Sequence, residues 1–482
     1  MIQDEELFFA RRLGYGLRKG ETIGGPVRDW AVKQISEAPP LDFYGPDGKS
    51  IRSRLPDYAE PVPGYEEATR LVGFYFNKEH EMELLVGKMP ERERDQKQFE
   101  EVDKPMKWYP EWREALLRSL TAVNGPSPVF ERFWAFWVNH FAVKAEQLST
   151  HWYGPHTRLI RSHMTGKFAD MLRDAELQPA MLFYLDNFLS SGPHSPAAKD
   201  GETINENLAR ELFELHTMSP AGGYSQTDVI EASFALSGWG FYAAKFDQPK
   251  LKIPTGAWYD TYRHEPGTRK ILGKVYGKAN KGQDQAPELI ADLAVHPATA
   301  QFISWKLIRH FVADEPPEDS VARVRDAWVQ SGGDLKTIHT AVIDEVIAKA
   351  PDNEKFATPE NWLHQAHRTA SIPVPIGLPQ SGAEYTINQV CDELGQGYAA
   401  VLQPNGYSDL KSDWISKELL ERRVRYAYRI SANAPPENAD YLREFAVRLA
   451  GKDSPLVAAV QGADPLRAVA TVLLASPQFM RI

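Results

Sequence analysis

Cysteine is nearly absent from this chain of 482 residues, because Cys391 is the only one. A lone cysteine forms no internal disulfide, and it excludes a metal site built from cysteines alone. Long apolar runs are also missing, since no segment approaches the roughly 18 apolar residues that cross a bilayer. The first residues, Met1 to Glu6, are acidic, whereas a signal peptide starts basic and then becomes apolar. We therefore expect a cytoplasmic chain without a membrane span, and export only if a leader has been trimmed.

An excess of positive charge is missing too. The formal net charge is −10, with 55 Lys and Arg against 65 Asp and Glu. Binding to nucleic acids or anionic membranes depends on clustered Lys and Arg, so we expect no nucleic-acid partner. The content of 43% hydrophobic and 25% charged residues is that of a globular protein able to bury a sizeable core.

Several catalytic motifs are absent from the sequence. It has no His-Glu-x-x-His, no Gly-x-Ser-x-Gly and no phosphate-binding loop that ends in Gly-Lys-Ser/Thr. No histidine follows a glutamate by three positions, so the Glu-x-x-His signature of di-iron bundles is missing as well. The segment Gly395 to Ala400 spells part of a dinucleotide fingerprint, but no strand precedes it. We interpret it as a turn at a helix end.

Apolar residues at three- and four-residue spacing dominate the chain, and this periodicity predicts helices. We expect an all-α fold, a large and irregular multi-helix array. Residues 240–277 differ, because they mix aromatics with Pro254, Gly256 and Gly267, and they predict a short β-hairpin or an extended loop. The predicted helices are 5–16, 65–86, 112–123, 129–143, 203–218, 227–238, 297–312, 320–330, 335–349, 359–369, 412–430 and 465–475.

Proline marks one helix start and one boundary. Thr358 and Pro359 have the residue types of an N-cap and a first helical position, and the helix that follows should carry Trp362 inward. Closely spaced prolines in residues 372–379 favour extended backbone. We therefore expect a main helical domain, 1–371, that contains the functional site, and a C-terminal helical unit, 372–482, packed on it.

The strongest candidate site is the segment 203–216. Thr203 and Glu206 match a capping box, which gives Glu206 a structural role. Helical spacing then places one polar stripe on a single face of the helix, opposite a face with leucines, Phe213 and His216. A solvated face with an Arg210 to Glu214 pair is the plain interpretation, and a cleft with a general base or metal ligand is the other. The stripe consists of Asn207, Arg210, Glu211 and Glu214.

A second candidate is the aromatic helix that ends at His140. Aromatic residues on nearly every side indicate burial on nearly every side, and buried polar groups then need hydrogen-bond partners. Asn139 and His140 belong either to a structural network or, for His140, to a pocket floor where it carries protons or binds a metal. We expect His140 to be buried among Phe133, Phe136 and Trp137.

The chain resembles the bacterial domain of unknown function 1800 family. The resemblance rests on motifs at 8–16, 136–141, 184–187, 205–212, 222–229, 236–239, 264–267, 296–300 and 404–407. The family often has a histidine where this chain has Val138, so a His-x-His metal pair is reduced to His140. The family also often carries an export signal, which we do not expect in this chain as given. The resemblance implies a fold and marks positions, but it names no reaction.

Two hypotheses follow from these patterns. The first is an enzyme that performs metal-assisted or acid/base modification of a peptide, protein or polymer substrate, with a divalent metal allowed as a cofactor. The second is a non-catalytic helical binding or scaffold protein. The oligomeric state stays open. The candidate catalytic residues are Glu211, Glu214, His140 and Arg210, and the candidate substrate-binding residues are Asn207, Trp137, Asn139, Asp186, Asn187, Trp239 and His264, with Asp260 beside them.

Overall fold

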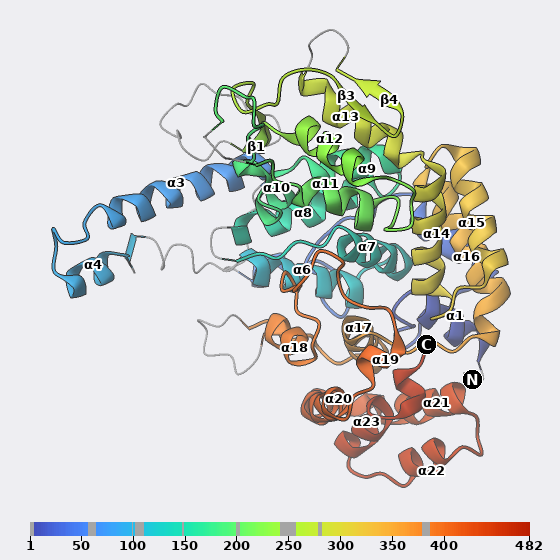
Figure 1. Ribbon diagram of the computed structural model, residues 1–482. Coiled ribbons are helices and arrows are strands. Elements are labelled where there is room, and N and C mark those ends of the chain that lie inside the picture. The colour runs from blue at the N-terminus through green and yellow to red at the C-terminus, as the bar shows by residue number, and fades with distance from the viewer. Residues whose placement is uncertain are drawn as a thin grey trace.

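The computed structural model describes residues 4–55, 64–98, 100–101, 110–146, 149–198, 203–241, 257–277, 282–377 and 386–482. Helices account for most of these residues, and the strands among them form two short antiparallel pairs. The predicted all-α fold class is therefore confirmed. Figure 1 shows α3 and α4 extending away from a body in which the other helices pack.

The helices are numbered in chain order. The first third contains α1 (Glu5–Leu13), α2 (Val27–Ile35), α3 (Tyr65–Glu83), α4 (Glu91–Gln98), α6 (Pro110–Asn124), α7 (Pro128–His140), α8 (Thr150–His163), α9 (Phe168–Glu176) and α10 (Pro179–Tyr184). Next come α11 (Asn207–Glu211), the π-helix η6 (Leu212–His216), α12 (Gln226–Leu236), α13 (Gly282–Ala294), α14 (Pro297–Phe311), α15 (Glu318–Ser331) and α16 (Leu335–Lys349). The last are α17 (Pro359–Ala370), α18 (Ile387–Glu393), α19 (Lys411–Trp414), α20 (Lys417–Ile430), α21 (Ala439–Ala450), α22 (Pro455–Gln461), α23 (Leu466–Leu474) and α24 (Pro477–Met480).

Helix α7 lies in the interior and contacts α1, α2, α6 and α8. Eleven of its 13 residues are buried, because its aromatic side chains point to all sides. Phe133 stacks against Phe311 of α14 and His339 of α16, with ring centroids 4.3 and 4.4 Å apart. Trp137 is fully buried, and its indole N–H donates to Nε2 of His339 at 2.9 Å. The aromatic helix thus ties the first helices to α14 and α16.

The strands occur where the sequence predicts extended chain. Strand β1 (Trp239–Phe241) pairs with β2 (Ala257–Tyr259), with Gly240 opposite Trp258. Strand β3 (Arg269–Ile271) pairs with β4 (Lys274–Tyr276), with Lys270 opposite Val275. Residues 242–256 of the predicted loop lie outside the described residues. The expected short hairpin is confirmed, and it is joined by a second short strand pair.

The predicted start of α17 is confirmed in detail. Thr358 is its N-cap and accepts a hydrogen bond from the amide of Asn361, Pro359 is its first residue, and Trp362 is fully buried. The boundary at 372–379 is only partly described, and there Ile372 and Val374 are buried rather than exposed. The division into 1–371 and 372–482 stays a prediction. No helix among the described residues is long and apolar enough to cross a membrane.

Candidate functional site

The polar stripe lies on one turn of α-helix that continues as a π-helix. Glu211 is the last residue of α11, and η6 begins at Leu212. The predicted capping box is wrong: Glu206 is the N-cap residue without a side-chain cap, and Thr203 lies exposed outside the helix. Instead, Oδ1 of Asn205 accepts a hydrogen bond of 2.9 Å from the amide of Asn207, so Asn205 satisfies a backbone donor at the start of the helix. Wide π-helical turns recur at functional sites, because they redirect side chains within a helix.

Arg210 is engaged by its own helix. Its guanidinium contacts Glu206 at 2.6 Å and Glu214 at 3.4 Å, and it donates to the side-chain oxygen of Gln226 at 3.0 Å. The predicted Arg210 to Glu214 pair is therefore present, with a closer pair to Glu206. The three charged side chains keep between 28% and 37% of their surface exposed, and Asn207 is exposed. The stripe is partly hydrated.

Glu211 differs from its neighbours on the stripe. It is partly buried, and no hydrogen bond to it is found among the described residues. Burial raises the pKa of Glu211; His216 opposes the shift, and the carboxylates of Glu214 and Glu176 add to it. A carboxyl group with a raised pKa and no hydrogen-bond partner among the described residues is suited to give up and take up a proton.

A buried polar cluster lies behind this turn. Nδ1 of His216 is 2.6 Å from Oε1 of Glu176, and both side chains are fully buried. The contact falls outside hydrogen-bond geometry, and neither side chain has another hydrogen-bond partner among the described residues. At 2.6 Å the imidazole and the carboxyl group are in direct polar contact. The Glu176–His216 pair holds the end of η6 against α9.

His140 connects this pair to α14. It is 2% exposed, so the expected burial is confirmed, and its ring contacts Phe136 and Trp137 but not Phe133. Nδ1 of His140 accepts from Nζ of Lys306 at 2.9 Å, and Nε2 is 3.3 Å from the carbonyl oxygen of His216. Burial lowers the pKa of His140 well below its ordinary value and the pKa of Lys306 to about 8. Both ring nitrogens of a neutral His140 are thus occupied.

The remaining predicted substrate-binding residues form a separate group. Nδ2 of Asn187 donates to the carbonyl oxygens of Leu236 and Trp239, at 3.2 and 2.8 Å, so this buried amide fixes the start of β1. Asp186 adopts a left-handed backbone, and its carbonyl oxygen accepts from Asn205. His264 is buried, and its Nδ1–H donates to the carbonyl oxygen of Ser237 at 2.9 Å. None of the four cavities described in the structure is lined by the stripe, by Trp239 or by His264.

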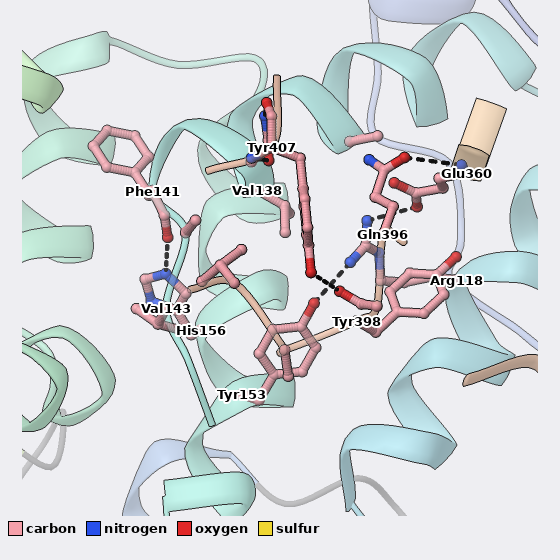
Figure 2. Close-up of a pocket in the computed structure, with 16 residues that line it drawn as sticks. Arg118, Val138, Phe141, Val143, Tyr153, His156, Glu360, Gln396, Tyr398 and Tyr407 are labelled. Carbon is pink, nitrogen blue, oxygen red and sulfur yellow. Dashed lines mark hydrogen bonds and ion pairs between the residues drawn. The ribbon is translucent and has the colours of Figure 1, made fainter. Parts of the chain in front are cut away.

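Asn139 belongs to a cavity that the sequence did not predict. The cavity has a volume of about 40 Å³ and lies where the loop after α18 covers α7. Figure 2 shows the Arg118 guanidinium between Tyr153 and Glu360. Arg118 donates to the Tyr153 hydroxyl at 3.0 Å and to Oε1 of Glu360 at 3.1 Å, and burial raises the pKa of Tyr153 to about 12. An ion pair between a buried guanidinium and a partly buried carboxylate, together with a phenol, therefore forms one wall.

The loop is fastened to α7 by a reciprocal pair of hydrogen bonds. Nδ2 of Asn139 donates to the carbonyl oxygen of Tyr407 at 2.9 Å, and the amide of Tyr407 donates to Oδ1 of Asn139 at 2.7 Å. The Tyr407 hydroxyl donates to the carbonyl oxygen of Gly397 at 3.0 Å. A turn at 395–400 follows α18, as the sequence predicts, with Gly395 at a φ of +90°. Asn139 therefore fixes the lid of the cavity and does not project into open solvent.

Replacing Gly406 with alanine should loosen this lid. Gly406 has a φ of +72°, and a Cβ there would lie 2.3 Å from the carbonyl oxygen of Asn139. We expect the variant to lose about 2–3 kcal/mol of unfolding free energy from strain and overpacking, measured by urea denaturation. Gly20→Ala is the control, because Gly20 has a φ of +80° with nothing within 4 Å of the new Cβ. The control should cost only about 1 kcal/mol, and equal losses would show that the contact with Asn139 is unimportant.

Sequence reasoning missed Arg118, Tyr153, Glu360 and Tyr398 as neighbours of one cavity. Arg118 and Glu360 are 242 positions apart, and no spacing rule links such residues. One signal did exist: the motifs at 136–141 and 404–407 both belong to the family resemblance, and they meet at the contact of Asn139 with Tyr407. Among the described residues, no group of three or more His, Cys, Asp or Glu side chains is placed to hold a metal ion. The metal therefore stays a prediction.

Comparison with known proteins gives one result. The family model described as a protein of unknown function, DUF1800, matches residues 9–481, which is nearly the whole chain. No curated protein and no solved structure matches the sequence or the fold at a significant level.

Proposed function

We propose that this chain, which belongs to the DUF1800 family, is an enzyme that uses Glu211 as a general acid or base. The observation that carries the proposal is the setting of this carboxyl group: it is partly buried, has a raised pKa and lacks a hydrogen-bond partner among the described residues. Carboxyl groups that serve only a structural role are normally satisfied by hydrogen bonds when they are buried. Glu211 is instead left available to a ligand.

The neighbouring side chains fix the helix around Glu211 but form no hydrogen bonds with its carboxyl group among the described residues. Arg210 restrains Glu214 and Glu206, and the Tyr224 hydroxyl is hydrogen-bonded to Glu214. His140 contacts the carbonyl oxygen of His216, so the buried cluster fixes the end of the π-helix from behind. In this proposal His140, Arg210 and Glu214 are positioning residues, and Glu211 alone meets the substrate.

The substrate class follows from the exposure of the stripe. Glu211 lies on a partly hydrated helix face with exposed Asn207 beside it, and none of the described cavities is lined by this face. Such a face suits a group presented on a larger molecule, and we propose a peptide, protein or polymer segment. The proposed step is a proton transfer, which contributes typically 10²–10⁴-fold to a rate.

Replacing Glu211 with glutamine should abolish activity and leave the fold intact. A panel of peptides and oligosaccharides is incubated with the wild type, Glu211→Gln and Glu206→Gln, and products are detected by mass spectrometry. We expect a mass change that the wild type and Glu206→Gln both produce and that Glu211→Gln slows by about 10²-fold or more. Glu206 is the matched control, because it is the N-cap residue of the same helix and its replacement also removes one carboxylate. If Glu211→Gln retains every wild-type conversion, Glu211 is not the acid or base.

The melting temperature of Glu211→Gln, compared with that of the wild type at two pH values, gives a second test of the proposal. A carboxyl group whose pKa is higher in the folded than in the unfolded chain stabilises the fold while protonated, and this contribution is lost as the pH rises through the folded pKa. Glutamine is neutral at every pH. Glu211→Gln should therefore match the wild type below pH 4 and melt at a higher temperature at pH 8. If Glu211→Gln melts at a lower temperature than the wild type at pH 8, Glu211 is not an unpartnered carboxyl group with a raised pKa.

The second candidate is a non-catalytic helical binding or scaffold protein. The observation that favours it is that both Nη atoms of Arg210 already donate to Glu206, Glu214 and Gln226, which leaves the guanidinium fewer donors for a substrate anion. In that case Glu211 would belong to the same network. Its replacement would then lower the stability at pH 8, which is the opposite sign to that expected for the enzyme.

A further inference from the structure

A second, smaller cavity adjoins the one in Figure 2, and the two form one polar site between α7 and the loop after α18. They share Ala135, Asn139, Glu360, Gln396 and Tyr407 as lining residues. The volumes are about 40 Å³ and about 20 Å³. This space takes a few water molecules or the end of a small ligand, but not a whole ring.

The formal charges around the joined cavities balance. Arg118 and Arg132 contribute two guanidinium groups, and Glu360 and Asp409 contribute two carboxylates. His310 lies between two of these, since its Nδ1–H donates to Oδ1 of Asp409 at 2.6 Å and its Nε2 accepts from Nε of Arg132 at 3.1 Å. Such a His310 is neutral. An ion of either sign would meet a like charge, so a neutral ligand is favoured.

Two buried donors on the wall of the second cavity have no acceptor among the described residues. They are Nη1 of Arg132 and Nδ2 of Asn361, and each side chain is 3% exposed. A buried donor without a partner costs about 1–3 kcal/mol. This cost is recovered when a ligand or water supplies the missing acceptor.

Acceptors line the same space. Glu360 uses Oε1 for Arg118, and Asp409 uses Oδ1 for His310, and no hydrogen bond among the described residues uses the second oxygen of either carboxylate. A hydroxyl group donates one hydrogen bond and accepts others, so neighbouring hydroxyls match such a mixed wall. Tyr153, Tyr398 and Tyr407 add the aromatic surface that is usual in small-molecule sites.

We infer that the joined cavities bind the hydroxyl-bearing end of a small neutral polyol. One hydroxyl accepts from Arg132 and Asn361 while it donates to Asp409 or Glu360, and the rest of the ligand extends past Tyr407 and Gln396. These two residues are partly exposed, so a ligand reaches the site from solvent at the loop. The inference does not depend on Glu211, which lies on another helix.

Calorimetric titration with erythritol and glycerol tests the inference. We expect the wild type to bind them with dissociation constants of about 1–10 mM and to bind acetamide and acetate at least tenfold more weakly. Ala135→Val narrows both cavities without removing a polar group, and we expect it to weaken polyol binding at least tenfold. Ala341→Val is the matched control, because Ala341 is also helical and partly exposed but lines neither cavity.

Asn361→Asp is the second variant, and it replaces an unpartnered donor with an acceptor. Polyol binding should fall at least tenfold in this variant too, while Glu211→Gln should bind erythritol as the wild type does. The inference is overturned if neither polyol binds the wild type, if acetate or acetamide binds as tightly as erythritol, or if Ala135→Val and Asn361→Asp both keep the wild-type affinity at unchanged melting temperatures. The Glu211→Gln result separates this site from the proposed enzymatic one.

Discussion

Replacing Arg161 with methionine is expected to lower the free energy of unfolding by about 3–5 kcal/mol. The Arg161 guanidinium donates two hydrogen bonds of 2.7 Å to the Glu131 carboxylate, and the two side chains are 7% and 2% exposed. It also donates to the carbonyl oxygen of Pro39 and stacks on Phe130 and Trp134. Methionine keeps much of the packing but leaves a buried carboxylate without its counter-charge. Urea denaturation at pH 7 measures the loss.

The matched control for this variant is Arg28→Met. Arg28 also makes two hydrogen bonds to one carboxylate, that of Asp344, but the side chains are 51% and 44% exposed. Exposed ion pairs contribute about 0–1 kcal/mol, because water solvates the separated charges well. The control should therefore cost less than about 1 kcal/mol. Equal losses for the two variants would mean that burial of the Glu131 carboxylate does not set the cost.

Local patterns predicted the helices where caps and periodicity agree. Helix α16 has the predicted bounds because Asp334 caps it and accepts from the amide of Thr337. The predicted helix 412–430 is instead two helices, because Ser416 caps the amide of Leu419 and so starts α20. Helix α8 was missed, and it holds Pro155 in its interior. In the sequence alone, a proline indicates a helix end, although tertiary packing can keep it inside a helix. For this reason the sequence did not predict α8.

The sequence predicted which residues of the candidate site share one face of a helix, but it did not predict their contacts with other helices. The spacing on 207–216 placed the stripe on the partly exposed side and Leu208, Leu212, Phe213 and His216 on the buried side, and the structure confirms this division. The pairing of His216 with Glu176 joins two helices 40 positions apart in sequence. Long-range pairs of this kind depend on how helices pack, and the spacing of apolar residues along one helix does not predict which helix packs against it.

Replacing His216 with leucine tests whether the buried pair behind Glu211 holds the fold. The variant leaves the Glu176 carboxyl group at 0% exposure without its contact to the imidazole, and breaking a buried pair in this way costs about 3–5 kcal/mol. We expect that loss in urea denaturation at pH 8. His163→Leu is the control, because His163 contacts Asp174 at 2.9 Å with 20% and 25% of the side chains exposed.

The double variant Glu176→Leu with His216→Leu separates charge from packing. Apolar residues of similar volume often replace a buried ion pair at no cost, so the double variant should recover most of the stability that His216→Leu loses. If it does so and still converts the substrate, the pair is structural and Glu211 acts alone. If it recovers the stability but loses the conversion that Glu206→Gln keeps, the pair sets the protonation or position of Glu211. A double variant as unstable as the single one would show that the shape of His216, rather than its contact with Glu176, holds the π-helix in place.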